Sequence, residues 1–370
     1  MDRKQPGTPL EVVLLFGGKS AEHEVSIQSA RNVAAALSPE RYRVVPVYLT
    51  RDGEWYLVDP AVLHGMDGRY RSLDREALSG SRRVLPSPRE GRLGLLDAAD
   101  GRLLEQGGCV YPVLHGPLGE DGTVQGMLRL FSIPFVGAGV LGSAVGMDKD
   151  VMKRLLREAG VPTPRFMVVR RGEEQPSYHA LAHSLGPRLF VKPANMGSSV
   201  GIRTADGQEA LSRALDEAFG YDTKVLVEES VAGREIECSV LQDGEYPIAS
   251  LPGEVVPGED YYSYRAKYLD GGTELVIPAD IPGPRRRAVQ DLAVRAFQVL
   301  CCEAMARVDL FLPERGSPLV NEINTLPGFT PISMYPKLWE ASGISTPELV
   351  DRLVGHALSR ARRERGLLLE

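Results

Sequence analysis

Four polar residues late in the chain are spaced so that they could act together on one ligand. The segment Met305–Asn324 contains two apolar strands around the turn ERGS, which is the pattern of a β-hairpin. With the turn centred on its Arg-Gly pair, Arg307 lies opposite Asn324 and Asp309 lies opposite Glu322. Because side chains alternate between the two faces of a strand, all four should point the same way.

These four side chains suit phosphate and metal chemistry. Asp, Glu and Asn offer hard oxygen ligands for Mg²⁺ that also binds substrate phosphates, and Arg offers forked donors for an anion. The other face of the hairpin should belong to the core, through Val308, Leu310, Leu312, Leu319 and Ile323. A solvated hairpin with a surface ion pair is the alternative that the pattern leaves open, and a register error of one residue would split the set.

A glycine- and serine-rich loop offers a phosphate site. Lys192 ends an apolar strand that begins at Leu189 and precedes the loop PANMGSSVG. Gly197 and Gly201 let the backbone approach a polyphosphate, and the serines between them add donors. Lys149, at the start of a predicted helix that ends near Ala159, supplies a second cation. An ordinary hairpin turn is equally compatible with the loop taken by itself.

Two other glycine motifs fail as nucleotide sites. LLFGGKSAEHE lacks the first glycine of a P-loop, since Val13 occupies that place. GAGVLG follows an expected strand at Ile133–Val136 and matches a dinucleotide fingerprint. That fingerprint also needs an acid after the next strand, but the strand at Arg165–Val169 ends in arginines, which argues against NAD. Polyphosphate binding is therefore expected at PANMGSSVG.

Composition narrows the class of protein. The chain has 370 residues, too many for one core, and its 43% hydrophobic and 25% charged content is typical of globular proteins. A net charge of −6 gives no broad basic surface for nucleic acid. The four cysteines lack metal-site spacing, and no apolar run near the start is long enough for a signal or membrane helix. We expect a cytoplasmic protein without nucleic-acid or membrane partners.

The first part of the chain alternates strands and helices. An apolar strand at Glu11–Phe16 precedes helical spacing up to Leu37, and further strands are expected at Tyr42–Leu49 and Val110–Leu114. That alternation predicts a wound parallel sheet. The region between the last two strands, about Arg51–Gly108, is rich in Arg, Gly and Asp and is expected to be a peripheral insertion with surface structure.

The remainder indicates mixed α+β structure. A capping box of Asp206 and Glu209 should begin a helix, and Val225–Glu228 should form a strand. Residues 235–240 then alternate polar and apolar before a turn at Asp243-Gly244, which predicts an antiparallel sheet with one solvated or ligand-facing side.

Seven motifs in order resemble the D-alanine–D-alanine ligases of the ATP-grasp superfamily. They are GGKSAEHEVS, LHGPLGEDGTVQG, GVLGSAVGMDKDVMK, VKPANMGSSVGI, YSYRAKYLDG, ARVDLFL and NEINTLPGFTPISMYP, and the similarity runs from Val12 to about Leu353. The resemblance implies an α/β domain at 1–148, including the insertion at 51–108. It also implies two α+β ATP-grasp subdomains with antiparallel sheets, at 149–234 and 235–370, that enclose ATP.

The resemblance also implies an activity. Such ligases use ATP to convert the carboxylate of one D-alanine into an acyl phosphate, which the amine of a second D-alanine attacks. The products are D-alanyl-D-alanine for peptidoglycan synthesis, ADP and phosphate. Two Mg²⁺ ions, with Mn²⁺ as a substitute, a monovalent cation such as K⁺ and a homodimer are implied as well.

Substrate and catalytic roles are implied residue by residue. Glu22 should hold the ammonium of the first D-alanine, with His115 beside it; read alone, these would be a first-turn helix charge and a structural histidine. The remaining implied roles are site closure by Ser198 and Tyr268, γ-phosphate contact by Lys267, an oxyanion hole at Arg307 and the amide of Gly328, and binding of the second D-alanine's carboxylate at Ser333 and Met334.

The implied ATP and metal sites use the motifs that the residue pattern selected. Asp309, Glu322 and Asn324 should bind Mg²⁺. The ATP contacts implied are Lys149, Lys192, Ser198, Ser199, Glu228, Glu229, Ser230, Val231, Glu235, Lys267, Asn321 and Glu322. The chain departs from many relatives at Glu229, where lysine is frequent, so the details of adenine recognition are open there.

Three rival functions remain at this point. A D-alanine–D-lactate ligase is disfavoured by Tyr268, which resembles the amine-using enzymes. Another carboxylate–amine ligase or a carboxylase would respond to L-amino acids or bicarbonate. A non-catalytic nucleotide-binding regulator would have no need of the full polar set on the hairpin.

Overall fold

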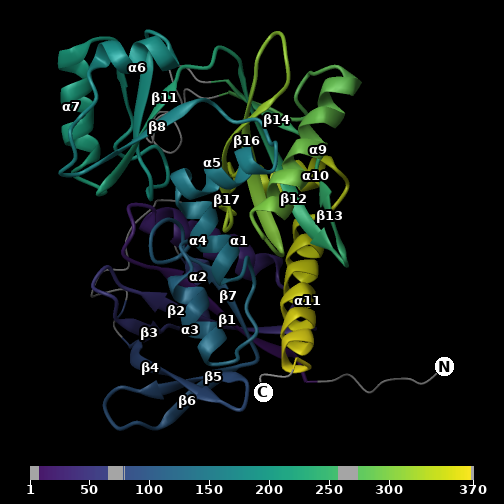
Figure 1. Ribbon diagram of the computed structural model, residues 1–370. Coiled ribbons are helices and arrows are strands. Elements are labelled where there is room, and N and C mark those ends of the chain that lie inside the picture. Colours follow the sequence, from purple (N-terminus) through teal and green to yellow (C-terminus); the bar gives the residue numbers. More distant parts are fainter. Residues whose placement is uncertain (1–7, 66–77, 79, 257–273, 368–370) are drawn as a thin grey trace. The chain divides into compact units, whose positions relative to one another are not determined.

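The computed structural model describes residues 8–65, 78, 80–256 and 274–367, and the chain forms two compact units (Figure 1). The first unit comprises Met1–Val140, Gln242–Glu245 and Leu326–Glu370, and the second comprises Leu141–Leu241 and Tyr246–Thr325. The finer division into domains at 1–148, 149–234 and 235–370 stays a prediction.

The first unit is built on a seven-stranded mixed sheet of order β6-β5-β4-β3-β2-β1-β7. Strand β1, next to the edge strand β7, runs parallel to both β2 and β7, as the alternating pattern predicted. Val12–Phe16 of β1 is entirely buried, because helices and loops cover both faces of a parallel sheet. The strands are β1 (Leu10–Gly17), β2 (Tyr42–Leu49), β3 (Trp55–Leu57), β4 (Arg82–Arg89), β5 (Arg92–Asp97), β6 (Leu103–Gly107) and β7 (Cys109–Val113).

The helices of this unit come from both ends of the chain. Helix α1 connects the parallel strands β1 and β2, and α11 contacts α1 and β7. Their bounds are α1 (His23–Ala36), α2 (Pro60–Gly65), α3 (Thr123–Leu130), α10 (Met334–Ala341) and α11 (Thr346–Arg365).

The expected insertion at 51–108 is more than surface structure, and that part of the expectation was wrong. It supplies β3 to β6, which extend the sheet from β2 with antiparallel pairing. Leu93 and Leu95 are fully buried in the same core as Val13 and Val45. The Arg- and Gly-rich composition did not indicate these strands, because an antiparallel sheet can have one solvated face that carries polar residues.

Arg360 of α11 ties that helix to the loop after β7, and its loss should destabilise the fold. It is 4% exposed, donates to the carbonyl oxygens of Phe135 (2.6 Å) and Gly137 (2.8 Å), and lies 4.2 Å from the ring centroid of Phe135. We expect Arg360→Met to lower the free energy of unfolding by about 2–4 kcal/mol, because two buried carbonyls lose their donor. Urea unfolding measures this, with the exposed Arg362→Met as control; equal stabilities would contradict the assignment.

The second unit contains two antiparallel sheets. The four-stranded sheet has the order β10-β9-β11-β8, and the six-stranded sheet has the order β15-β14-β12-β16-β17 with β13 paired to β12. The first sheet consists of β8 (Phe166–Arg170), β9 (Leu189–Pro193), β10 (Arg203–Ala205) and β11 (Lys224–Glu229). The second consists of β12 (Arg234–Asp243), β13 (Tyr246–Ala249), β14 (Gly253–Val256), β15 (Glu274–Val276), β16 (Met305–Leu312) and β17 (Leu319–Asn324).

Helices cover each sheet of the second unit. Leu211 and Leu215 of α7 are buried with Val191 and Val225 in one core, whereas Phe297 of α9 is buried against the six-stranded sheet. The helices are α4 (Val140–Met147), α5 (Lys149–Glu158), α6 (Tyr178–Leu185), α7 (Gln208–Ala218) and α9 (Gly283–Val299).

Two local predictions were wrong. Gly207, not Asp206, is the N-cap of α7 and makes no side-chain cap bond, so Glu209 falls one position early for a reciprocal capping box. The strand expected at Ile133–Val136 is a single parallel bridge between Val110 and Phe135. Pro134 has no amide hydrogen, which limits a ladder there.

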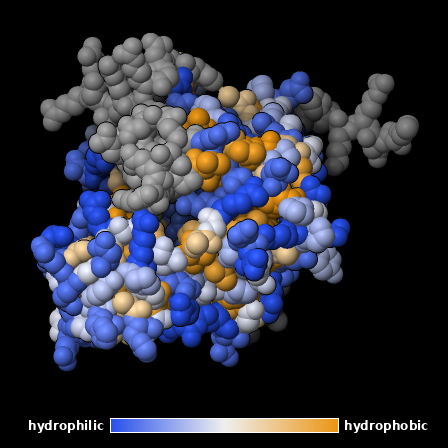
Figure 2. Space-filling model, turned by 90° about the horizontal axis from the view of Figure 1, so that it is seen from above, coloured by the Kyte–Doolittle hydropathy of each residue, from blue (hydrophilic) through white to orange (hydrophobic). Residues whose placement is uncertain are grey.

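The surface is mostly hydrophilic in the face shown in Figure 2, with smaller hydrophobic patches. Among the described residues, no helix has both the length and the apolar character needed to span a membrane.

Candidate functional site

The hairpin of β16 and β17 has the predicted register at its polar positions. Arg307 pairs with Asn324, and Asp309 pairs with Glu322. Their side chains are partly buried, whereas Val308 and Ile323 on the opposite face belong to the core. The expectation that the four polar groups share one face is therefore confirmed.

A β-bulge modifies the hairpin closer to its turn. The register shifts between Asp309 and Leu310, because Leu310 pairs with Val320 and leaves Asn321 as the extra residue. Val320 rather than Leu319 is consequently fully buried, which corrects one member of the predicted core face. A bulge re-aims side chains, and here it lets consecutive residues Asn321 and Glu322 line one cavity.

Arg307 is held between two carboxylates. It donates to Asp309 through Nε at 2.7 Å and through Nη2 at 2.8 Å, and its Nε lies 3.0 Å from Oε2 of Glu237. Asn324 Nδ2 also donates to Asp309, at 3.2 Å. Glu237 is 5% exposed and pairs with Asp309 across β12 and β16, a role that the sequence analysis did not assign. The alternating pattern of residues 235–240 could have indicated this role, because it places Glu237 on the same face as Glu235.

A cavity of about 550 Å³ lies between the two sheets of the second unit. That volume is within the usual range of about 300–1,000 Å³ for ligand pockets. Lining residues come from β9, β11, β12, β14, β16 and β17 and from the segment between β11 and β12. The predicted ATP and metal residues that line it are Lys192, Ser199, Glu228, Glu229, Ser230, Val231, Glu235, Asp309, Asn321 and Glu322.

Two predicted ATP residues do not line this cavity directly. Lys149, at the start of α5, places Nζ 3.4 Å from Oε2 of Glu322 and donates to the carbonyl oxygen of Met196 at 2.6 Å. Ser198, the other residue, lies two positions after Met196 in the glycine–serine loop. Lys149 thus connects the glycine–serine loop to the acidic hairpin, although the two are far apart in sequence.

The glycine–serine loop contains unusual backbone conformations. Ser198 and Ser199 have φ angles of 48° and 60°, and Gly201 has 71°. Left-handed conformations are unfavourable for residues with a Cβ and persist where surrounding structure fixes them, commonly at functional sites. A Cβ on Gly201 would lie 2.7 Å from the Tyr221 ring, so only glycine fits there.

Glu228 lies between two lysines at the back of the cavity. Its carboxylate is 2.7 Å from Lys192 Nζ and 3.2 Å from Lys153 Nζ, and Lys192 also donates to Asn321 Oδ1 at 3.1 Å. Burial raises the pKa of Glu228, but the two lysines outweigh it and hold that pKa below its usual range. Lys153 was missed by the sequence analysis, although it lies one helical turn after Lys149 on α5.

Glu229 has a partner within the protein. Arg165 donates to its carboxylate from the backbone amide and from Nε, both at 2.7 Å. The acid at this position therefore anchors the start of β8 to the end of β11.

In the first unit, a hydrogen-bond chain connects His115 to the segment after Leu326. His115 Nδ1 donates to the Leu326 carbonyl oxygen at 2.9 Å, and its Nε2 makes a hydrogen bond with Ser29 Oγ at 3.2 Å. Ser29 Oγ in turn accepts from the Phe329 amide at 3.0 Å. These contacts fix the orientation of the imidazole ring, and Ser29 is a site residue that the sequence pattern did not indicate.

The other predicted substrate residues of the first unit lie close to this chain. A Cβ on Gly116 would be 3.3 Å from Glu22 Oε2, which places that carboxylate beside the residue that follows His115. A Cβ on Gly328 would be 2.7 Å from Ser333 Oγ and 3.8 Å from Ser29 Oγ. Glu22, His115, Gly328 and Ser333 are thus brought together within one unit.

Glu120 connects the same two segments from the other side. Its carboxylate accepts from the Gly116 amide at 2.8 Å and from the Leu326 amide at 3.2 Å. Glu120 belongs to the motif LHGPLGEDGTVQG, but the motif does not indicate this role, because the donor at Leu326 is more than two hundred residues away.

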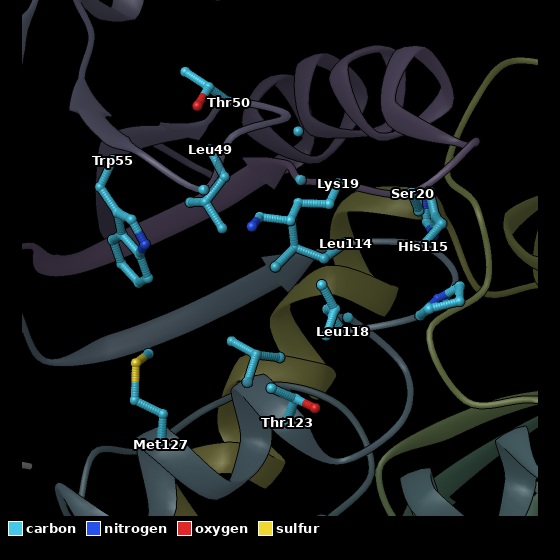
Figure 3. Close-up of a pocket in the computed structure, with 16 residues that line it drawn as sticks. Lys19, Ser20, Leu49, Thr50, Trp55, Leu114, His115, Leu118, Thr123 and Met127 are labelled. Carbon is cyan, nitrogen blue, oxygen red and sulfur yellow. The ribbon is translucent and has the colours of Figure 1, made fainter.

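A second cavity, of about 220 Å³, opens beside the Gly17-Gly18 turn (Figure 3). Its walls are mainly apolar, with Leu49, Trp55, Leu114, Leu118 and Met127 around it and Lys19 reaching across. Glu22, Gly328, Ser333 and Met334 do not line it. His115 does line it, so the cavity adjoins the cluster that the resemblance assigns to D-alanine.

The turn itself is held rigidly. His23 is fully buried; its Nδ1 donates to the Gly18 carbonyl oxygen at 2.6 Å, and its Nε2 accepts from the Tyr48 hydroxyl at 2.9 Å. Gly17 and Gly18 have φ angles of 96° and 91°, which require glycine. Glu22 directly precedes His23 as the N-cap residue of α1, so it lies between the glycine turn and the buried His23.

Lys267 and Tyr268 lie outside the described residues. The roles that the resemblance gives them stay predictions.

Comparisons with known proteins agree over nearly the whole chain. Family models described as the D-ala D-ala ligase N-terminus and C-terminus match residues 11–138 and 155–355. A D-alanine–D-alanine ligase of Shouchella clausii is 45% identical over 360 residues, covering 96% of each chain.

Two solved structures match closely as well. The D-alanine–D-alanine ligase from Coxiella burnetii has a TM-score of 0.84 at 36% identity and covers 96% of this chain and 97% of that one. The VanG D-Ala:D-Ser ligase from Enterococcus faecalis has a TM-score of 0.82 at 32% identity and covers 95% of this chain and 100% of that one. With both family models matched and this agreement in sequence and structure, the chain belongs to the D-alanine–D-alanine ligase family.

Proposed function

We propose that the protein is an ATP-dependent ligase that joins two D-alanine molecules for peptidoglycan synthesis, releasing ADP and phosphate. The observation that carries this proposal is the second-unit cavity, where Lys192, several carboxylates and Ser199 of the glycine–serine loop surround a space large enough for a nucleotide. Family membership supplies the substrate, because curated relatives of nearly equal length are named D-alanine–D-alanine ligases.

The nucleotide would bind with its phosphates toward Lys192 and the loop at Ser199, and with its base toward the segment between β11 and β12. Ser230 and Val231 of that segment line the cavity and offer backbone groups to adenine, and Glu235 follows for the ribose. Lysines neutralise the charge of a transferring phosphoryl group, which is most of what an enzyme supplies in such a transfer.

The hairpin fits a magnesium site. Asp309 and Glu322 face each other in register, and Glu322 lines the cavity with its side chain 23% exposed. No group of three or more His, Cys, Asp or Glu side chains converges in the described ranges, so two carboxylates and the Asn324 amide would share the metal with phosphate oxygens. Bound Mg²⁺ would neutralise phosphate charge and polarise the transferred group.

The first unit contains the residues that would bind the two D-alanine molecules. Glu22 would hold the ammonium of the first D-alanine, with His115 beside it. Ser333 is the N-cap of α10, and the helix N-terminus at Met334 suits the carboxylate of the second D-alanine. Met334 is 3% exposed, so its contribution would come from the backbone amide.

Arg307 would stabilise the negative charge that develops when the amine attacks the acyl phosphate. Its guanidinium is fixed by Asp309 and Glu237, so the donors need no reorganisation during the reaction. The resemblance assigns the Gly328 amide to the same oxyanion.

The identity of the second substrate is the finer question. One similar structure is a D-Ala:D-Ser ligase, so this fold accepts a second substrate other than D-alanine. D-Lactate is the other alternative, and the residue that discriminates against it, Tyr268, lies outside the described residues.

A product assay tests the proposal. The protein is incubated with Mg²⁺-ATP and D-alanine, and ADP, phosphate and the mass of the product are measured; parallel reactions contain D-serine, D-lactate, L-alanine or bicarbonate. We expect D-alanine-dependent ADP release with D-alanyl-D-alanine as the main product. ATP binding without turnover would favour a regulator, and turnover with bicarbonate or L-alanine alone would favour another ligase or a carboxylase.

Further properties of the family complete the proposal. We propose a cytoplasmic homodimer with the domain division 1–148, 149–234 and 235–370, two Mg²⁺ ions and stimulation by a monovalent cation. Metal removal should abolish turnover, and restoring Mg²⁺ or Mn²⁺ should recover it.

A further inference from the structure

Two lysines bracket the Glu228 carboxylate, but they occupy different surroundings. Lys192 lines the nucleotide cavity, and its side chain is 7% exposed. Lys153 lies on the opposite side of the carboxylate, is fully buried and does not line the cavity. Only Lys192 could therefore turn toward a phosphate that enters the cavity.

We propose that Lys153 is a positioning residue, the permanent counter-ion of Glu228, which frees Lys192 to move to the phosphates of ATP. This inference rests on the proposed function, since it concerns the nucleotide site. Lys153 itself touches neither ATP nor the reacting atoms and acts through Glu228.

When Lys192 moves to a phosphate, it leaves the negative charge of the Glu228 carboxylate behind. Glu228 is 3% exposed, and a buried carboxylate without a cation is strongly unfavourable. If Lys192 were the single partner of Glu228, its move to the phosphates would leave the buried carboxylate without a cation. With Lys153 at 3.2 Å, Glu228 remains neutralised while Lys192 exchanges it for a phosphate oxygen.

The contact between Lys153 and Glu228 is ionic. Within the described part of the chain, neither Lys153 Nζ nor Glu228 Oε1 has a hydrogen-bond partner. The pKa of Lys153 is lowered to about 8, first by burial and also by Lys192, whereas Glu228 and the more remote Glu322 act to raise it. Lys153 remains charged at neutral pH, as a counter-ion must.

Helix geometry explains why Lys153 is placed there. Residues four apart lie on the same face of a helix, so Lys149 and Lys153 both project from one side of α5. Lys149 reaches the Met196 carbonyl and Glu322 near the ligand, and Lys153 lies in the interior behind Glu228.

The test replaces Lys153 and reads ATP binding directly. Mg²⁺-ATP is titrated calorimetrically into wild type and Lys153→Met, and steady-state turnover gives KM values for ATP and D-alanine. We expect ATP affinity to fall by about ten- to a hundredfold, since Lys192 is then retained by Glu228, whereas the KM for D-alanine is unchanged. The added change Glu228→Gln should raise the affinity from that of Lys153→Met to that of Glu228→Gln alone, because glutamine has no charge that needs a cation.

Lys224→Met is the matched control. Lys224 is also a poorly exposed lysine held by two carboxylates, Asp148 and Asp150, but neither partner lines the cavity. It should lower the melting temperature without the selective loss of ATP affinity. If Lys153→Met does not fold, the comparison moves to Lys153→Met/Glu228→Gln against Glu228→Gln alone, which should bind ATP equally.

Two results would overturn the counter-ion role. One is unchanged ATP affinity in Lys153→Met, and the other is a loss that Glu228→Gln fails to relieve. Failure of the proposed function is distinguishable, because wild type would then bind ATP in the calorimeter without D-alanine-dependent turnover.

Discussion

Turnover should fall by about 10²–10³-fold when Arg307 is replaced by alanine, the usual effect of removing one oxyanion donor. The reason is positional: two carboxylates fix the guanidinium before the reaction starts, and no other arginine of the described residues has this pair of partners. D-alanine-dependent ADP release measures the loss, together with direct binding of Mg²⁺-ATP, which should change much less.

Two companion variants separate chemistry from folding. Arg307→Lys keeps a positive charge near Asp309 and Glu237 but loses the forked donors, so it should fold normally and still be strongly impaired. Arg285→Met removes an arginine that donates to backbone carbonyls of the loop joining β16 and β17, including that of Glu314 at 3.0 Å. It should weaken the hairpin and retain turnover. Near-normal dipeptide formation by Arg307→Ala would count decisively against the proposed role.

The second large effect is expected at Glu322. Glu322→Gln removes a negative ligand opposite Asp309 and the partner of Lys149 at 3.4 Å. Several kcal/mol of transition-state stabilisation depend on a well-held metal, so turnover should drop by about a thousandfold. ADP release measured over a range of Mg²⁺ concentrations should show a raised requirement for the metal as well as a lower maximum.

Glu314→Gln provides the control on the same hairpin. Glu314 is exposed in the loop between the strands, and no ion pair of its side chain is found among the described residues. This variant should match wild type in turnover and in its Mg²⁺ dependence. If Glu322→Gln behaved in the same way, the magnesium site would have to lie elsewhere.

The polar face of the hairpin was predictable because it depends on two local rules. A strand alternates its faces at every residue, and a short turn fixes which residues pair. The bulge at Asn321 was not predictable, since an extra residue leaves the sequence pattern almost unchanged. Its consequence is substantial, because Asn321 and Glu322 both reach the cavity and Val320 replaces Leu319 in the core.

Roles that depend on distant partners were missed for a different reason. Ser29, Glu120 and Lys153 are ordinary residues in their own helices and loops. Their importance comes from the Phe329 amide, the Leu326 amide and the Glu228 carboxylate, each brought close by folding. Local pattern carries no information about which remote backbone group a side chain will meet.

The sequence by itself determined the parallel strands around β1, the two antiparallel sheets and the hairpin register at Asp309 and Glu322. Its ordered motifs also determined the family. Only the tertiary structure decided how β3 to β6 complete a core, which residues line the nucleotide cavity, and that two lysines share one buried carboxylate. The physical reason is that periodicity and turns act over a few residues, whereas burial and charge pairing depend on elements from the whole chain.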